Sequence, residues 1–229
     1  MRNPIIAAAC GSLAIWMLAA PTAAPQELPR YTPGEDFIFD NGRVEEVRAI
    51  EGESIVWAAR SGRTYVRSAN PIVPILEWSF RGQIGEREVL GDPDGLWPLR
   101  PGASVQFRTV NIARDEDTGD ARRSLHLWRC NVGRLERVET PAGAFDAYPL
   151  RCDRFSPSSM RVLERITWHY AADVGHYVQR EARDMRSGET ETIRLAAQLA
   201  PREANPLRIE TIAQQARTGQ TEALRSLDP

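Results

Sequence analysis

The sequence contains no lysine, and all 29 of its basic residues are arginine. Schiff-base chemistry, a P-loop phosphate site and a Ser-x-x-Lys nucleophile pair each require a lysine amine, so these chemistries are excluded. A Gly-x-Ser-x-Gly nucleophile elbow is also missing. The formal net charge is -2, so the chain has no excess of basic charge with which to hold nucleic acid.

Cysteine is scarce as well, with three residues, and the first of them lies in a segment typical of a secretory signal. Residues 1–24 combine a short basic start, an apolar stretch over residues 5–20 and small residues before Pro25. The apolar stretch is shorter than the roughly 20 residues that span a bilayer. We therefore expect a cleaved signal peptide, a periplasmic location and no integral membrane segment in the mature chain. Most of the apolar stretch follows Cys10, so we do not expect lipoprotein anchoring there.

The other two cysteines, Cys130 and Cys152, are expected to form a disulfide. A hairpin that turns about Pro141 places Cys130 opposite Cys152, and it places Val132 opposite Leu150. An even number of cysteines in an oxidising compartment favours a bridge. The alternative is a pair of buried free thiols.

Apolar residues recur with period two between glycine turns, which predicts a mainly β protein built as an antiparallel meander or half-barrel. We expect a small β subdomain over residues 31–90 and a long-stranded sheet or half-barrel over residues 91–200. A turn-rich joint at residues 91–102 separates them. After Pro201 the spacing becomes helical, which predicts a short C-terminal helical segment within residues 201–229. The predicted strands of the longer sheet cover residues 104–112, 124–138, 144–154, 161–170, 176–185 and 189–199.

Three stretches resemble a signature of bacterial cell-envelope proteins of unknown function. They read VETPAGAFDAY at residues 138–148, WHYAADVGHY at residues 168–177 and LWPLRPG at residues 96–102. The resemblance covers residues 91–186 and has the form TPAGxFxxY … WxYAxxVG. It implies a periplasmic antiparallel β domain, loosely similar to the open half-barrels of lipoprotein carriers. It implies no catalytic residue and no cofactor.

Several large side chains share one face of the predicted hairpin and of the strands after it. We expect this apolar face to bind a lipid, another apolar ligand or an envelope partner, without catalysis. The candidate residues are Trp128, Val132, Tyr148, Leu150, Trp168 and Tyr170.

Two other functions stay open. His169 and His176 flank a short turn, and with His126 they would supply the three imidazoles of a metal-assisted hydrolase. The C-terminal helical segment, residues 205–229, could instead dock an assembly partner. A calcium loop at residues 115–120 is disfavoured, because Gly119 and Asp120 reverse the order that an EF-hand requires.

Overall fold

The structure is a computed structural model that describes residues 27–80 and 82–219. The predicted signal peptide with Cys10, and residues 220–229 of the predicted tail, lie outside this part of the chain. The described residues form thirteen strands, one 3₁₀ turn and one α-helix. The elements are β1 (Asp36–Phe39), β2 (Val44–Glu51), β3 (Ser54–Ala59), β4 (Thr64–Ser68), β5 (Glu77–Phe80), β6 (Gln83–Gly91), η1 (Pro93–Leu96), β7 (Ser104–Asp115), β8 (Ala121–Val132), β9 (Glu136–Thr140), β10 (Gly143–Phe155), β11 (Val162–Ala171), β12 (His176–Asp184), β13 (Thr190–Leu199) and α1 (Pro206–Thr218).

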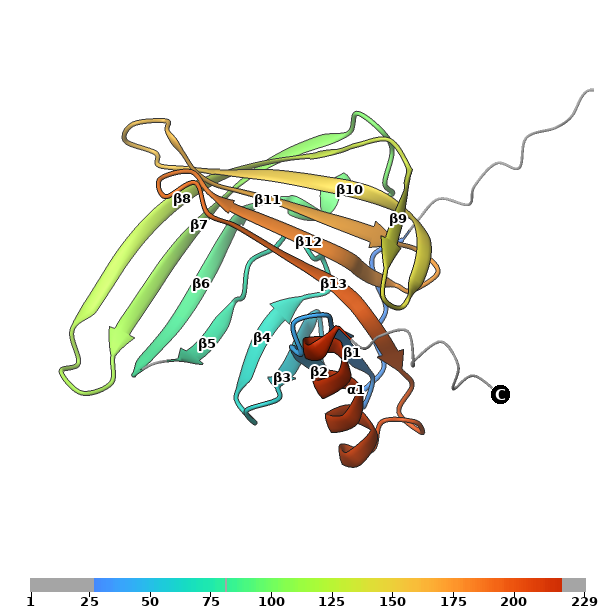
Figure 1. Cartoon of the computed structure of the whole chain (residues 1–229). Coiled ribbons are helices and arrows are strands. Elements are labelled where there is room, and N and C mark those ends of the chain that lie inside the picture. The colour runs from blue at the N-terminus through green and yellow to red at the C-terminus, as the bar shows by residue number, and fades with distance from the viewer. Residues whose placement is uncertain (1–26, 81, 220–229) are drawn as a thin grey trace, which may run out of the picture.

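Twelve of the described strands close into an antiparallel barrel, with β9 as an extra strand beside β10 (Figure 1). Strands that follow one another in the chain pair with each other, except that β8 pairs with β10 instead of β9, so β10 pairs with β8, β9 and β11. The ring closes because β1 pairs with β13, where Asp36 lies opposite Leu199. Pairing the first strand with the last leaves no open edge along the wall of the barrel.

The mainly β, antiparallel prediction is confirmed, whereas the open half-barrel is corrected to a closed barrel. Residues 31–90 do not close on themselves, because β6 pairs with β7 over nine positions and so joins both halves in one sheet. The closing contact joins residues more than 150 positions apart. Local hydrophobic periodicity carries no information about such a contact.

The disulfide joins Cys130 on β8 to Cys152 on β10, which lie directly opposite each other as the hairpin register predicts. The single strand expected over residues 124–138 is interrupted, since β8 ends at Val132 and β9 begins at Glu136. The cause lies at Gly133, whose N–H donates to the Pro149 carbonyl at 2.8 Å. A Cβ at position 133 would lie 2.5 Å from Pro149 Cγ, so only glycine fits this crossing.

The two ends of the barrel differ. Neighbouring strands run antiparallel, so successive connections alternate between the ends. One end, here named the closed end, carries the connections at residues 69–76 and 92–103. The other, here named the open end, carries the turns at residues 116–120, 156–161 and 185–189.

The closed end is filled by the protein's own side chains. Ile72, Leu96 and Leu99, from its two long connections, are buried in the main hydrophobic core. Asn70 ties these connections together, because its Nδ2 donates to the Pro93 carbonyl at 3.1 Å. The side chains of this core come from strands all around the ring, so the barrel is plugged at this end.

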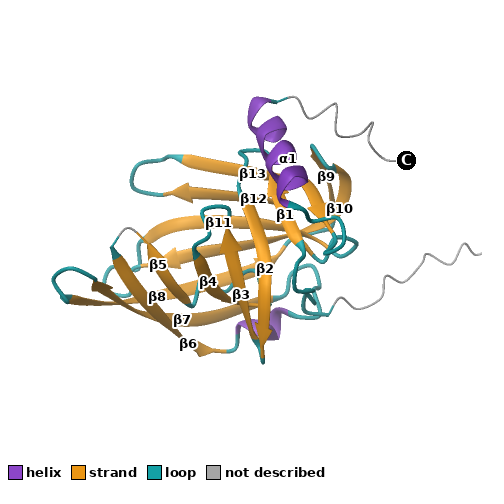
Figure 2. Ribbon diagram, turned by 90° about the horizontal axis from the view of Figure 1, so that it is seen from below, coloured by secondary structure: helices purple, strands orange, loops and turns teal. Residues whose placement is uncertain are grey.

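Helix α1 covers the outside of the barrel at β1 and β13 (Figure 2). Its buried residues Ile212 and Ala213 pack on Ile38 and Leu199. Phe37 and Phe39 point into the barrel, so β1 is buried on both faces. The helix ends at Gly219, whose φ of 72° suits a left-handed cap. No helix in the described part of the chain combines the length and the apolar character that crossing a membrane requires.

Candidate functional site

The barrel is hollow toward its open end, where a cavity of about 520 Å³ lies among strands from most of the ring. Water reaches it, since the side chains of Arg154 and Glu164 beside the 156–161 turn are 26% and 27% exposed and that of Arg43, at the turn between β1 and β2, is 39% exposed. Five arginines and four aromatic side chains dominate the lining. They are Arg43, Arg67, Arg87, Arg154 and Arg180, with Trp78, Trp128, Trp168 and Tyr177.

The arginines point inward because they follow the period of the apolar residues on the same strands. Arg154 lies two residues after Cys152, and Arg180 lies opposite Trp168. Arg87 on β6 likewise shares the inward face of the wall. Side chains two apart on a strand face the same way, so these guanidinium groups enter the barrel instead of the solvent outside it.

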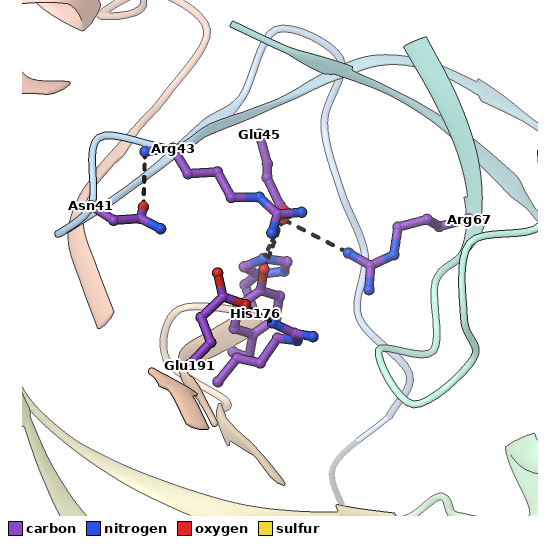
Figure 3. A network of polar contacts seen from close by, with 8 residues as sticks. Asn41, Arg43, Glu45, Arg67, His176 and Glu191 are labelled. Atoms are coloured by element: carbon purple, nitrogen blue, oxygen red, sulfur yellow. Dashed lines mark hydrogen bonds and ion pairs between the residues drawn. The ribbon is translucent and has the colours of Figure 1, made fainter. Parts of the chain in front are cut away.

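One side of the cavity is built on Glu45, which is fully buried. Arg43 and Arg67 approach its carboxylate from two sides, with Arg43 Nη2 2.7 Å from Oε1 and Arg67 Nη1 3.8 Å from Oε2 (Figure 3). The Tyr177 hydroxyl donates to Oε2 at 3.0 Å. Arg43, Arg67, Glu45 and Tyr177 are here named the floor cluster. Two guanidinium groups share one carboxylate in it, so the cluster keeps one positive charge.

The floor cluster is held charged by its surroundings. Burial by itself would raise the pKa of Glu45, but Arg43, His176 and Arg67 together hold that pKa well below its usual range. His176 lies behind the carboxylate, with Nε2 3.6 Å from Glu45 Oε2 and Nδ1 2.8 Å from the Tyr31 hydroxyl oxygen. Burial lowers the pKa of His176, so its imidazole is neutral at pH 7. The carboxylate is therefore ionised and the net charge of the cluster is fixed.

A second group of charged side chains lines the cavity from β6, β7, β8, β10 and β11. Arg154 Nε donates to Glu164 Oε2 at 3.1 Å, and Arg87 Nε donates to Asn111 Oδ1 at 2.5 Å. Asn111 Nδ2 in turn lies 3.0 Å from His126 Nδ1. Arg87, Asn111, His126, Arg154 and Glu164 are here named the rim cluster. It also has two guanidinium groups and one carboxylate, and so one net positive charge.

The positive charge of the rim cluster is poorly compensated. Among the described residues, Arg87 pairs with no carboxylate. Burial and then the charge of Arg154 lower the pKa of Arg87 to about 10, against the opposing effect of Glu164. Burial, Arg154 and Arg87 likewise lower the pKa of His126. A buried cation beside another cation costs stability unless something outside the protein compensates it.

The lining of the cavity carries several hydrogen-bond donors. The Trp128 indole N–H donates to Thr109 Oγ1 at 3.1 Å, and Arg87 also donates to the Ile75 carbonyl. The indole N–H of Trp168, a residue only 3% exposed, is buried with no partner among the described residues. A free indole N–H beside several guanidinium groups suits a ligand rich in acceptor oxygens.

The predicted apolar-face residues all reach the inside of the barrel. Tyr148 is partly buried against the core, and the other five belong to it: Trp128, Val132, Leu150, Trp168 and Tyr170. The two tryptophans also line the cavity. The arginines beside them were missed, although Arg154 in phase with Leu150 and Cys152 was a visible signal of an inward charge.

The structure does not bring the predicted metal ligands together. His169 Nε2 lies 2.9 Å from Glu136 Oε1 in a polar groove lined by β8 and β10–β12, whereas His176 is enclosed by Phe37, Tyr177 and other rings of the core. His126 belongs to the rim cluster. No group of three or more His, Cys, Asp or Glu side chains in residues 27–80 and 82–219 is arranged to hold a metal ion.

Comparison with known proteins yields likenesses of fold only. No protein-family model and no curated protein matches the sequence. The hypothetical lipoprotein YmcC of Escherichia coli is 12% identical, with a TM-score of 0.48 over 73% of this chain and 86% of that one.

Two further solved structures are similar over 77% of this chain and the whole of theirs. A candidate exported protein with a YmcC-like fold from Bacteroides fragilis is 14% identical, with a TM-score of 0.42. A candidate lipoprotein from Parabacteroides distasonis is 13% identical, with a TM-score of 0.35. At these values, none of the three assigns a family or a function to this chain.

Proposed function

We propose that this protein is an exported binding protein that takes a small organic anion into the open-end cavity of its barrel. The observation that carries the proposal is the convergence of five arginines on one interior cavity. Inward arginines are costly without a counter-charge, and one of the five, Arg87, has no carboxylate partner in the described chain. A bound anion would supply that counter-charge.

The aromatic lining favours a ligand with an apolar or aromatic body. Trp78 and Trp128 lie beside the arginines, and Arg87 already stacks on Trp78 with its Cζ 4.9 Å from the ring centroid. The purely apolar ligand expected from the sequence suits this cavity less well. Such a ligand would bury the guanidinium groups without replacing the hydrogen bonds that water gives them, and it would leave the Trp168 N–H unpaired.

The expected periplasmic location fits the proposal. The disulfide between Cys130 and Cys152 is of a kind that persists in oxidising compartments and is rare in the cytosol. We therefore retain export through the signal peptide as part of the proposed function, with lipid anchoring at Cys10 left out.

A pair of fluorescent probes tests whether the cavity selects an anion. The dyes 8-anilinonaphthalene-1-sulfonate and N-phenyl-1-naphthylamine share one aromatic skeleton, and only the first carries a negative charge. We expect the sulfonate to bind at least about tenfold more tightly in fluorescence titrations, because each charge-assisted hydrogen bond contributes about 1.5–3 kcal/mol. Equal binding of the two dyes, or binding of the neutral dye alone, would contradict the proposal.

Matched arginine variants locate the bound sulfonate. Arg87→Gln removes an inward charge that touches the cavity, whereas Arg108→Gln removes a charge from the exposed outer face of β7 in the same wall. We expect the first variant to weaken sulfonate binding about tenfold and the second to leave it unchanged. If Arg108→Gln weakened binding as much as Arg87→Gln did, the dye would be bound outside the barrel.

A further inference from the structure

The cavity holds its uncompensated charge in two separate places. The floor cluster keeps one positive charge, because Arg43 and Arg67 share Glu45. The rim cluster keeps another, because Glu164 pairs with Arg154 while Arg87 has no carboxylate partner in the described part of the chain.

The fifth arginine does not add to either charge. Arg180 Nη1 forms an ion pair with Glu191 Oε2 at 3.0 Å. Arg180 lies opposite Trp168 on the neighbouring strand, and both side chains line the cavity. This part of the wall is therefore neutral overall, and it presents an aromatic ring with a free N–H donor.

The arginines of the two clusters interact with different charged groups, which indicates that the clusters are separate subsites. The groups whose charges act on Arg87 are Arg154 and Glu164, whereas those that act on Arg43 include Glu45 and Tyr177. The two clusters also come from different strands of the ring. In the floor cluster, Arg43 directly precedes β2 and Arg67 lies on β4, whereas the rim arginines lie on β6 and β10. Both clusters nonetheless line the same cavity.

Resting on the proposed function, we infer that the ligand is an organic dianion whose two anionic groups are separated by an apolar body. One anionic group binds Arg67 and Arg43 at the floor, and the other binds Arg87 and Arg154 at the rim. The body between them lies along Trp128 and Trp168. A ligand with a single charge fills one subsite and leaves the other uncompensated.

Naphthalene probes of equal size test this inference by calorimetry. Naphthalene-2,6-disulfonate carries two separated charges and naphthalene-2-sulfonate carries one. We expect the disulfonate to bind at least about tenfold more tightly at 0.15 M salt, since it compensates both subsites. A series of α,ω-alkanedicarboxylates should show one preferred chain length, which measures the distance between the subsites.

Variants of each subsite make the inference falsifiable. We expect Arg87→Gln and Arg67→Gln each to reduce disulfonate affinity to within about threefold of monosulfonate affinity, while Arg108→Gln changes neither. Arg67 is buried beside Glu45, so Arg43→Gln, which removes the other and more exposed guanidinium group of the floor cluster, serves if Arg67→Gln does not fold. Circular dichroism confirms folding before titration.

The outcomes separate this inference from the proposed function. Equal affinities for the two sulfonates, or equal weakening of both probes by Arg67→Gln, would overturn the two-subsite inference and leave anion binding intact. Equal affinity for dicarboxylates of every chain length would also count against the two-subsite inference. If neither sulfonate binds, the proposed function itself fails.

Discussion

The closed and open ends of the barrel use the same strands for different purposes. At the closed end the inward side chains are aromatic and aliphatic, and Phe107 on β7, Val132 on β8 and Leu150 on β10 are almost completely buried. At the open end the same strands turn arginine, asparagine and histidine inward around a cavity. The first arrangement stabilises the fold by burying apolar surface. The second costs stability, and such costs are typical of binding sites.

The difference also assigns separate tasks to the tryptophans. Trp57 is 1% exposed and packs against Tyr31 with ring centroids 5.0 Å apart. Trp78 is only half-buried and lies over Gly85, where a Cβ would come within 2.0 Å of its ring. We read Trp57 as core and Trp78 as cavity wall.

The largest expected effect tests this division of tasks. Trp57→Ala should lower the free energy of unfolding by about 4 kcal/mol, because it empties a large volume in the packed end. Trp78→Ala should lower it by about 1 kcal/mol, because that ring is partly in water. Urea denaturation of both variants measures the difference. Similar losses would show that the two ends contribute alike to stability and would break the comparison.

A smaller effect is expected at Glu45, which is buried beside the arginines of the cavity. Glu45→Gln keeps the size of the side chain but leaves Arg43 and Arg67 without a buried counter-charge, and we expect a loss of about 3 kcal/mol at pH 7. The loss should depend on pH. The pKa of Glu45 is held low in the folded protein, so its contribution is present above the unfolded value of about 4.3 and fades as the pH falls further.

Denaturation curves of the protein and of Glu45→Gln between pH 3 and pH 7 check this sign. The two stabilities should converge as the pH falls below about 4. A constant difference down to pH 3 would mean that the carboxylate is not ionised in the folded protein, and the floor cluster would then carry two positive charges instead of one.

The same comparison explains what the sequence could and could not predict. The pairing of Cys130 with Cys152 and of Val132 with Leu150 was predicted, because apolar inward faces give a period-two pattern, although the strand expected over residues 124–138 is interrupted at Gly133. Strand β6 was missed. Its inward residues include Gly85 and Arg87, so a strand that lines a polar cavity shows no apolar alternation.

The candidate site was predicted only in its aromatic half. Trp128 and Trp168 were selected because apolar side chains are the usual signal of an inward face. The floor cluster could not be predicted, because it depends on contacts between distant parts of the chain, such as Tyr177 with Glu45. The uniform use of arginine hid the remaining signal, since inward and outward basic residues are of one type.

The smallest expected effect concerns His126, whose imidazole faces Arg87, Asn111, Arg154 and Glu164 across the rim cluster. Burial and the two arginines hold its pKa below 6.5, so it is neutral at pH 7. A bound sulfonate would offset the arginines and raise that pKa, so binding takes up a proton and strengthens as the pH falls below about 6.5. We expect naphthalene-2,6-disulfonate, whose own charge does not change, to bind roughly three- to tenfold more tightly at pH 5 than at pH 7.5.

Two histidine variants test the assignment to His126. The affinity of His126→Asn for the disulfonate should not change with pH, whereas His169→Asn, altered in the groove outside the cavity, should keep the pH dependence. A slope that survives His126→Asn would assign the proton to another group and remove His126 from the anion site.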